Sequence, residues 1–422
     1  MTSGTGTFRG HVTLAFCTLL HAVTHAYQIL LVPLYLLMVK DLGLGGVERA
    51  ALIVSVCSGV YFLLSYPAGV LTDRLNRKML LGVGLIGNAL AIGLLGATHQ
   101  YWVLVCLAAA GGVFGSLFHP AANALVPAHY PKSPGMAVGL MGIGSGIGFF
   151  AGSQYAGWRA ETVSAPWWGM SSWQVPCVEM GLLGVVVGIL FLLFAREAAY
   201  AHVRSKAEPM GRGMRRRMLA ISLILGCRDF AGVGTVSLVS VYLQKAHGFS
   251  TKETGWIIGT MGLISIVATP ISVWMTGGRR RLPGLGCIVI AAGLAQLAVP
   301  HVAVGWILPV LAMFQVFHLS TYAVGEVALV ELVRAAVRGR VIGLFLTVAG
   351  TLGASSPWIM GLWTDAMGSA AAEQGAYVLP FSVLGVTMIL SSLSLPLLAK
   401  LGTIQQSGMS DAMLAGATQP PV

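Results

Sequence analysis

Gly69-Val-Leu-Thr-Asp73-Arg74-Leu-Asn76-Arg77-Lys78 is the densest run of charge in the first 190 residues, and it lies between two long apolar stretches. Arg74, Arg77 and Lys78 cross a bilayer only at high cost, so they fix the side of the membrane on which this loop stays. Asp73 is placed either to pair with a cation or to cap the next helix. The stretch therefore predicts a charged turn between two membrane-spanning helices.

Two further residues of this stretch suit a tight turn. Gly69 allows the end of a helix to approach a neighbour closely, and Asn76 tolerates the left-handed backbone better than most residues do. The plainer interpretation is an ordinary charged loop that only sets topology. Both interpretations require long apolar segments on either side.

The composition of the whole chain places it in a membrane. The chain has 422 residues, of which 56% are hydrophobic and 9% charged, whereas soluble proteins carry about 25% charged residues. Its net charge of +11 comes from short loops between apolar runs, which argues against a nucleic-acid partner. All six cysteines fall inside apolar runs without disulfide or zinc spacing. The first apolar run is too long for a cleaved signal and is expected to remain as a helix.

Twelve segments are long and apolar enough to span a bilayer, which needs about 20 residues each. They cover residues 11–38, 49–71, 79–98, 102–127, 135–157, 175–195, 218–244, 253–275, 283–300, 304–330, 340–362 and 376–399. This pattern predicts an all-α membrane protein. It divides into a six-helix bundle over 1–195, a basic cytoplasmic linker over 196–217, a second six-helix bundle over 218–400 and a disordered cytoplasmic tail over 401–422.

The basic residues are distributed unequally between the two sides. Nineteen of the 25 lie before the first span, after the last span, or in loops that follow an even-numbered span. Five lie in or beside the loops that follow an odd-numbered span, and Arg228 lies inside span 7. By the positive-inside rule, both termini face the cytoplasm. Trp167, Trp168 and Trp173, on the opposite side, are expected to form an interfacial aromatic belt.

Ionisable and polar side chains within spans are costly in lipid, so each is a candidate functional residue. The candidates are His21 and His25 in span 1, His119 and Asn123 in span 4, Arg228 and Asp229 in span 7, and His318, Tyr322 and Glu326 in span 10. A shift of 207 residues places His21 on Arg228 and His119 on Glu326, which suggests two repeats with a site at their interface. Pro120, beside His119, is expected to bend its helix and free a carbonyl.

Three interpretations of these residues stay open. His and Glu side chains can exchange protons during transport. Arg228 can bind an anion, with Asp229 as its counter-ion. The same groups can instead be structural, hydrogen-bonded across helices. A metal-binding alternative also exists, because His21, His25, His119, Asp229 and Glu326 are ligand types that Zn²⁺ or Fe²⁺ prefers.

Other sequence features concern packing and energy supply. Glycines at 111, 112 and 115 in span 4, and at 142, 144, 146, 148 and 152 in span 5, allow close helix approach. The phosphate-binding pattern Gly-x-x-x-x-Gly-Lys-Ser/Thr is absent, as is a nucleophile elbow. We therefore expect neither direct ATP use nor enzymatic activity, and no cofactor.

The opening stretch resembles the Gly-x-x-x-Asp-Arg-x-Gly-Arg-Lys motif of the major facilitator superfamily, with Asn76 in place of its second Gly. His21-x-x-x-His25-x-Tyr27, Phe118-His119-Pro120-Ala121-Ala122 and Arg228-Asp229 resemble the fosmidomycin-resistance-like branch of that superfamily. The resemblance implies two six-helix bundles that rock about a cavity lined by spans 1, 4, 7 and 10. It also implies that Gly69, Asp73, Arg74, Arg77 and Lys78 form a conformational latch that holds the cytoplasmic side in the outward-facing state.

The expected function is therefore secondary transport of a small solute, coupled to protons, of the drug-efflux or small-anion-efflux type. The glycine-rich fifth span is similar to the antiporter motif of the superfamily, although Phe149 and Phe150 stand where its Pro is expected. Expected partners are the solute, protons and membrane lipid, with the chain acting as a monomer in a bacterial inner membrane; an organelle membrane is the alternative address. A transition-metal transporter and a non-transporting scaffold or sensor are the rival functions.

Overall fold

The computed structural model of the chain describes residues 8–163, 169–198, 210–333 and 335–401, and every regular element in these ranges is helical. The α-helices are α1 (Phe8–Ile29), α2 (Tyr35–Asp41), α3 (Val47–Leu63), α4 (Ser65–Thr72), α5 (Arg77–Leu95), α6 (Tyr101–Gly115), α7 (Phe118–His129), α8 (Pro134–Thr162), α9 (Gln174–Phe194), α10 (Arg212–His247), α11 (Thr251–Met275), α12 (Arg281–Ala298), α13 (Val304–Leu332), α14 (Ala335–Ala354), α15 (Ser356–Ala366) and α16 (Val378–Leu390). Short 3₁₀ turns are η1 (Val32–Leu34), η3 (Gly278–Arg280), η4 (Val299–His301), η5 (Gly368–Ala372), η6 (Gln374–Tyr377) and η7 (Ser391–Leu393).

These helices form twelve candidate membrane spans. Eleven runs within the described residues are long and apolar enough, and α3 with α4, bent by 42°, makes the twelfth. The predicted number of spans is thereby confirmed. The span boundaries differ most at α10, which begins at Arg212, so that Arg215, Arg216 and Arg217 belong to a helix instead of the predicted linker. Residues 199–209 of that linker and the predicted tail over 402–422 lie outside the described residues.

Several spans are broken where the sequence interrupts the helical hydrogen bonds. Span 1 is broken at η1, which contains Pro33, and the freed carbonyl oxygens of Val32 and Pro33 accept hydrogen bonds from Ser240 and Gln244 of α10 (2.6 and 3.2 Å). Span 4 is broken between α6 and α7, one turn before Pro120, as predicted. Such breaks are tolerated inside a membrane only where other groups of the protein satisfy the freed backbone.

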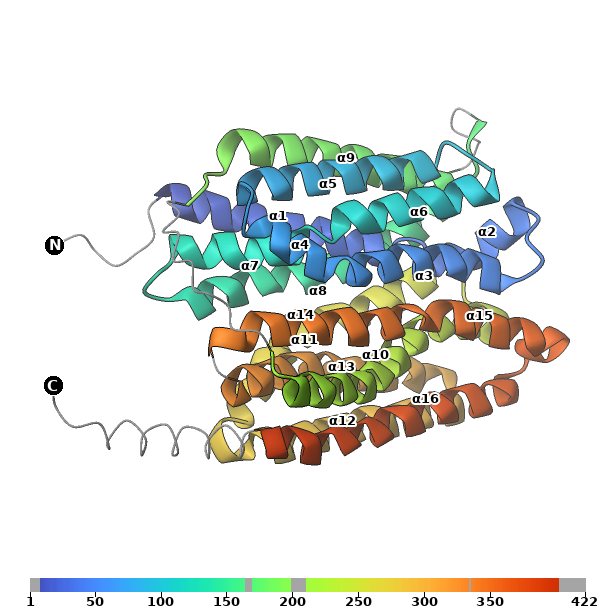
Figure 1. Cartoon of the computed structure of the whole chain (residues 1–422). Helices are drawn as coiled ribbons and strands as arrows, with labels where there is room; N and C mark the ends of the chain where they lie inside the picture. The colour runs from blue at the N-terminus through green and yellow to red at the C-terminus, as the bar shows by residue number, and fades with distance from the viewer. Residues whose placement is uncertain (1–7, 164–168, 199–209, 334, 402–422) are drawn as a thin grey trace, which may run out of the picture.

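The spans form two bundles of six (Figure 1). Helices α1–α9, blue to green, make one bundle, and α10–α16, green to red, make the other. They meet along two seams, α8 against α11 and α3 against α14 and α15. The start of α1 and the end of the last span lie at the same end of the molecule in Figure 1.

Glycines allow the closest helix contacts, as the sequence predicted, except at Gly142, where a Cβ atom would meet nothing within 4 Å. A Cβ atom at Gly144, Gly148 or Gly152 of α8 would lie 2.2–2.6 Å from backbone atoms of α1, which is too close for any side chain. Gly146, on another face of α8, packs on Ile266 of α11. The fifth span therefore holds span 1 on one side and the second bundle on the other.

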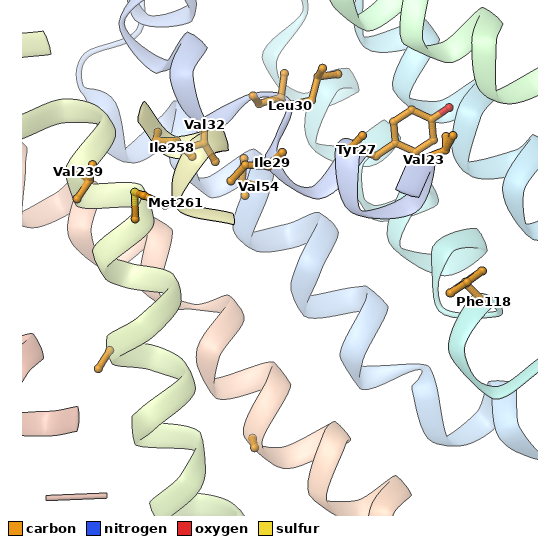
Figure 2. Packing of buried hydrophobic residues seen from close by; sticks show 14 of the residues in the cluster. Val23, Tyr27, Ile29, Leu30, Val32, Val54, Phe118, Val239, Ile258 and Met261 are labelled. Atoms are coloured by element: carbon orange, nitrogen blue, oxygen red, sulfur yellow. The ribbon is translucent and has the colours of Figure 1, made fainter. Parts of the chain in front are cut away.

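Apolar side chains fill the junction between the bundles. Figure 2 shows Val32, from the break in span 1, in the same cluster as Ile258 of α11 and Val239 of α10. Away from this junction, Leu182, Leu183, Val186, Ile189 and Leu193 form an exposed apolar face on α9, as a lipid-facing helix requires. The molecule thus has apolar surfaces both at its bundle interface and toward lipid.

The expected aromatic belt is not formed by Trp173. This side chain is 1% exposed, and its indole N–H donates to Asp41 at 2.8 Å, so it packs inside the first bundle. Trp167 and Trp168 lie outside the described residues. Trp102, Trp274 and Trp306 are exposed instead, near the ends of their spans.

Candidate functional site

Three of the predicted site residues form a histidine cluster in the first bundle. His21 and His25 are one turn apart on α1, and His119 follows the break in span 4. Ligand nitrogens of the three rings lie within 4.8 Å of one another. The Nε2 atoms of His21 and His25 are 3.0 Å apart. The sequence therefore predicted a real cluster, which the fold assembles from spans 1 and 4.

The cluster has an aromatic and partly open environment. His21 is 6% exposed and stacks on Phe118, with ring centroids 4.9 Å apart. His25 packs against Phe149 of α8 at 4.7 Å, and His119 meets Tyr61 of α3 edge-on at 6.1 Å. His25 and His119 are each partly exposed. The cluster is therefore not completely enclosed by the protein.

A second cluster lies in the other bundle, centred on Arg228. This side chain is fully buried, and its Nε donates to Oδ1 of Asp229 at 2.8 Å, while Nη1 donates to the carbonyl oxygen of Thr321 at 3.1 Å. The guanidinium lies over the ring of Tyr322, 4.2 Å from its centroid. Arg228 is thus paired and stacked, as a buried charge must be.

Glu326 and His318 complete this second cluster along α13. Glu326 lies one turn after Tyr322, next to Gly325, where a Cβ would lie 3.5 Å from Nη1 of Arg228, and its own side chain is exposed. His318 stacks on Phe314 at 5.3 Å, and neither of its buried ring nitrogens has a hydrogen-bond partner among the described residues. Spans 7 and 10 therefore place charged and neutral titratable groups together.

The five residues that the metal-binding alternative combined lie in two separate clusters. Within the described residues, His21, His25 and His119 are the only group of three or more such side chains with ligand atoms this close. Asp229 and Glu326 belong to the Arg228 cluster instead. Asn123, one turn after His119, is exposed. A five-ligand site is therefore not formed.

Some contributing groups carried no signal in the sequence. The carbonyl oxygen of Met141 receives the Nδ1 proton of His21 at 2.9 Å, and that of Thr321 receives a proton of Arg228. Backbone carbonyls are present at every residue, so only the fold reveals which ones are used. Tyr61 could have been noticed as a polar group within span 2.

The predicted latch is a charged turn with a different internal geometry. Asn76 adopts an extended backbone (φ −63°, ψ 119°) and accepts a hydrogen bond from Met79 N at 2.9 Å, so it caps α5 instead of supplying a left-handed turn. A Cβ atom at Gly69 would meet nothing within 4 Å, so the expected close approach is also wrong. Asp73 does not cap the next helix, because Asn76 occupies that position.

The cations of this turn differ in their contacts. Arg77 donates to the carbonyl oxygen of Ala124 in α7 at 3.1 Å, and the backbone N–H of Lys78 donates to Glu197 at 2.8 Å. Asp73 and Arg74 are exposed. The turn is therefore tied to span 4 and to the end of span 6 through Arg77 and Lys78.

At the opposite end of the molecule, two carboxylates join the bundles. Asp365, in the last turn of α15, accepts hydrogen bonds from the backbone N–H groups of Val47 and Glu48 at the start of α3 (2.9 and 2.8 Å). Glu161, in the last turn of α8, accepts one from Lys252 at the start of α11 (2.7 Å). We call these two contacts the outer clasps. Each bundle supplies one carboxylate and one helix N-terminus.

An apolar groove lies apart from both polar clusters. It has a volume of about 880 Å³ and runs between α8, α11 and α13, with Phe150, Trp158, Phe249, Trp256 and Ile307 among its lining residues. None of the predicted site residues lines it. The polar clusters therefore remain the better candidates for ionisable chemistry.

Twelve spans in two bundles, with ionisable clusters on spans 1, 4, 7 and 10, define an integral membrane protein of the secondary-transporter type. The family model of the Major Facilitator Superfamily matches residues 14–357. The chain belongs to this superfamily, whose members are transporters and not enzymes. The predicted fold and family are confirmed, while the narrower resemblance to the fosmidomycin-resistance-like branch stays a prediction.

Relatives of known name support this assignment. Multidrug resistance protein MdtG of Dickeya zeae (strain Ech586) is 35% identical over 257 residues, which cover 58% of this chain and 60% of that protein. The chain thus matches less than two thirds of that relative's length. The uncharacterized MFS-type transporter YqjV of Bacillus subtilis (strain 168) is 23% identical over 367 residues, covering 83% and 84%.

Solved structures share the fold. A bacterial homologue of the human lysosomal transporter Spinster, in inward-facing occupied and unoccupied conformations, matches with TM-scores of 0.74 and 0.72 at 17% and 16% identity. Each comparison covers 95% of this chain and 97% of that one. At these identities, the likeness concerns the arrangement of the helices alone.

Proposed function

We propose that this protein is a proton-coupled secondary transporter that exports a small organic solute by alternating access. The observation that carries the proposal is the Arg228 cluster, where the buried Arg228–Asp229 pair of span 7 stacks on Tyr322 of span 10 and an exposed Glu326 follows one turn later. A carboxyl group in that position can take up and release a proton, and Arg228, which is buried in this conformation, adds a positive charge that attracts an anionic group of the solute. The relative named for multidrug resistance makes drug-like compounds the first candidates.

The distribution of charge supports the proposed orientation. Arg77, Arg212, Arg279 and Lys400 lie at one end of the spans, and Lys40, Arg159 and Lys245 lie at the other, less basic end. The first end is assigned to the cytoplasm by the positive-inside rule. The outer clasps then close the external side, so the described conformation is closed to the outside. The chain acts as a monomer in an inner membrane.

The proposal is tested by separating proton coupling from solute binding in liposomes. The panel contains fosmidomycin, a fluoroquinolone and ethidium, and flux is measured with a pH gradient and, separately, by solute exchange at equal pH. Glu326→Gln removes the titratable proton and keeps the shape. We expect it to lower gradient-driven flux by about tenfold or more, equivalent to at least about 1.4 kcal/mol, while solute exchange persists.

His301→Gln, at an exposed histidine near the start of span 10, is the matched control and should leave both fluxes unchanged. Wild-type gradient-driven flux in Glu326→Gln would remove this carboxyl from coupling. The Arg228→Lys variant keeps the charge but loses the planar geometry, and it should raise the KM for fosmidomycin more than that for ethidium.

A further inference from the structure

We propose that His21, His25 and His119 bind one divalent transition-metal ion, with imidazole nitrogens as its three protein ligands. The nearest pair of nitrogens, Nε2 of His21 and Nε2 of His25, is 3.0 Å apart, and all three rings offer a nitrogen within 4.8 Å of the others. Ligand nitrogens about 2.0–2.1 Å from a tetrahedral Zn²⁺ lie about 3.3 Å apart. Small rotations of the rings therefore reach metal-binding geometry.

The hydrogen bond to Met141 fixes the chemical form of His21. A carbonyl oxygen only accepts, so Nδ1 of His21, 2.9 Å away, carries the proton. The other ring nitrogen, Nε2, then has a free lone pair directed at His25. A backbone carbonyl that orients a ligand histidine in this way is the usual support of a protein metal site.

The environment of the cluster selects the type of ion. It contains three imidazoles and no carboxylate, and its walls are Phe118, Phe149 and Tyr61. Imidazole ligands suit Zn²⁺, Co²⁺, Ni²⁺, Cu²⁺ and Fe²⁺, whereas Mg²⁺ and Ca²⁺ require oxygen ligands. His25 and His119 are partly exposed, which leaves a fourth position for water or another donor.

All three ligands belong to the first bundle, and two of them lie one turn apart on α1. The ion would therefore not bridge the two bundles. Its affinity should depend little on which side of the transporter is open. This separates the metal site from the Arg228 cluster, and its test does not depend on transport.

The test is metal binding by the full-length chain, purified in detergent on a tag without histidine and stripped with a chelator. Zn²⁺ and Co²⁺ are added, and bound metal per chain and the Co²⁺ absorption spectrum are measured. We expect one ion per chain, a tetrahedral Co²⁺ spectrum, and affinity lowered about 10-fold or more in His21→Ala, His25→Ala and His119→Ala. His99→Ala and His301→Ala, at exposed histidines outside both clusters, should bind as the wild type does.

Equal binding by the wild type and His119→Ala would overturn the proposal. X-ray absorption of the Zn²⁺-loaded wild type gives a second measurement that depends on no variant. Three nitrogen ligands of imidazole type at about 2.0 Å support the site. A shell of oxygen ligands alone, or fewer than two imidazoles, would also overturn it.

Discussion

At the scale of single residues, an ionisable side chain inside a membrane span is stable where other groups of the protein contact it, as Asp229 and Tyr322 contact Arg228. Histidines and charged residues inside apolar runs stood out because lipid makes them costly, and the structure gathers most of them into two clusters. Asn76 was interpreted wrongly, because the preference for a left-handed backbone competes with the preference for capping a helix. Its side chain binds the N–H of Met79, and the cap decides the conformation.

The charge of Asp73 gives the first prediction at this scale. Asp73→Asn keeps the size of the exposed side chain and removes its charge, so the fold should persist while transport slows about tenfold, or about 1.4 kcal/mol in activation free energy. Initial rates of drug efflux from cells, together with the melting temperature in detergent, measure both effects. Leu75→Asn, at an exposed neighbour, is the control. Normal turnover in Asp73→Asn would argue against the latch.

At the scale of helices, the spacing of glycines along the sequence predicted close helix packing, which requires no polar group. Gly144, Gly148 and Gly152 recur every fourth residue, so they share one face of α8 and admit the backbone of α1. The sequence could not show which helix would use that face, because many apolar helices offer a suitable surface. The breaks in spans 2 and 11 were missed, although Pro67 and Pro357 lie in the first turn after them, as Pro120 does in span 4.

Two glycines of α8 provide a matched pair of variants. A Cβ at Gly148 would lie 2.2 Å from the carbonyl oxygen of Ala22, whereas one at Gly142 would meet nothing within 4 Å. We expect Gly148→Ala to lower the melting temperature and the yield of folded protein strongly. Gly142→Ala should be neutral or stabilising by up to about 1 kcal/mol through helix propensity. Thermal unfolding in detergent compares them, and equal behaviour would contradict the packing described.

The outer clasps predict a shift in conformation. Asp365→Ala removes an acceptor from the start of α3, which costs about 1 kcal/mol and should raise the population open to the outside about fivefold. In a background without other cysteines, Val54→Cys, which is 8% exposed, reports opening through its labelling rate with a membrane-impermeant maleimide. Glu373→Ala, at an exposed carboxyl nearby in the chain, should leave the rate unchanged. An unchanged rate in Asp365→Ala would show that the clasp does not hold that side closed.

For the molecule as a whole, the fold was predictable because the membrane imposes simple rules. Length and hydropathy determine the spans, and the superfamily model confirms the arrangement. The association of the two bundles was harder to predict. Besides apolar packing, it uses Asp365 and Glu161 as acceptors for the helix starts at Val47, Glu48 and Lys252, and nothing in the sequence shows that these carboxylates reach across to the other bundle.

Topology gives the prediction at this scale. In a chain without other cysteines, a membrane-impermeant maleimide applied to intact cells should label Gly45→Cys and spare Arg279→Cys, because the more basic end lies in the cytoplasm. Both positions are exposed in the fold, so both should react after permeabilisation. Labelling of Arg279→Cys in intact cells would reverse the orientation and with it the assignment of the outer clasps.

The placement of one polar cluster in each bundle has a consequence for cargo shape. The imidazoles lie on spans 1 and 4 of the first bundle and the guanidinium lies on span 7 of the second, so rocking of the bundles alters the distance between them. A solute that bound the histidine cluster and the Arg228 cluster at the same time would be stretched or compressed by that motion. The protein would then select solutes by the distance between their two polar groups.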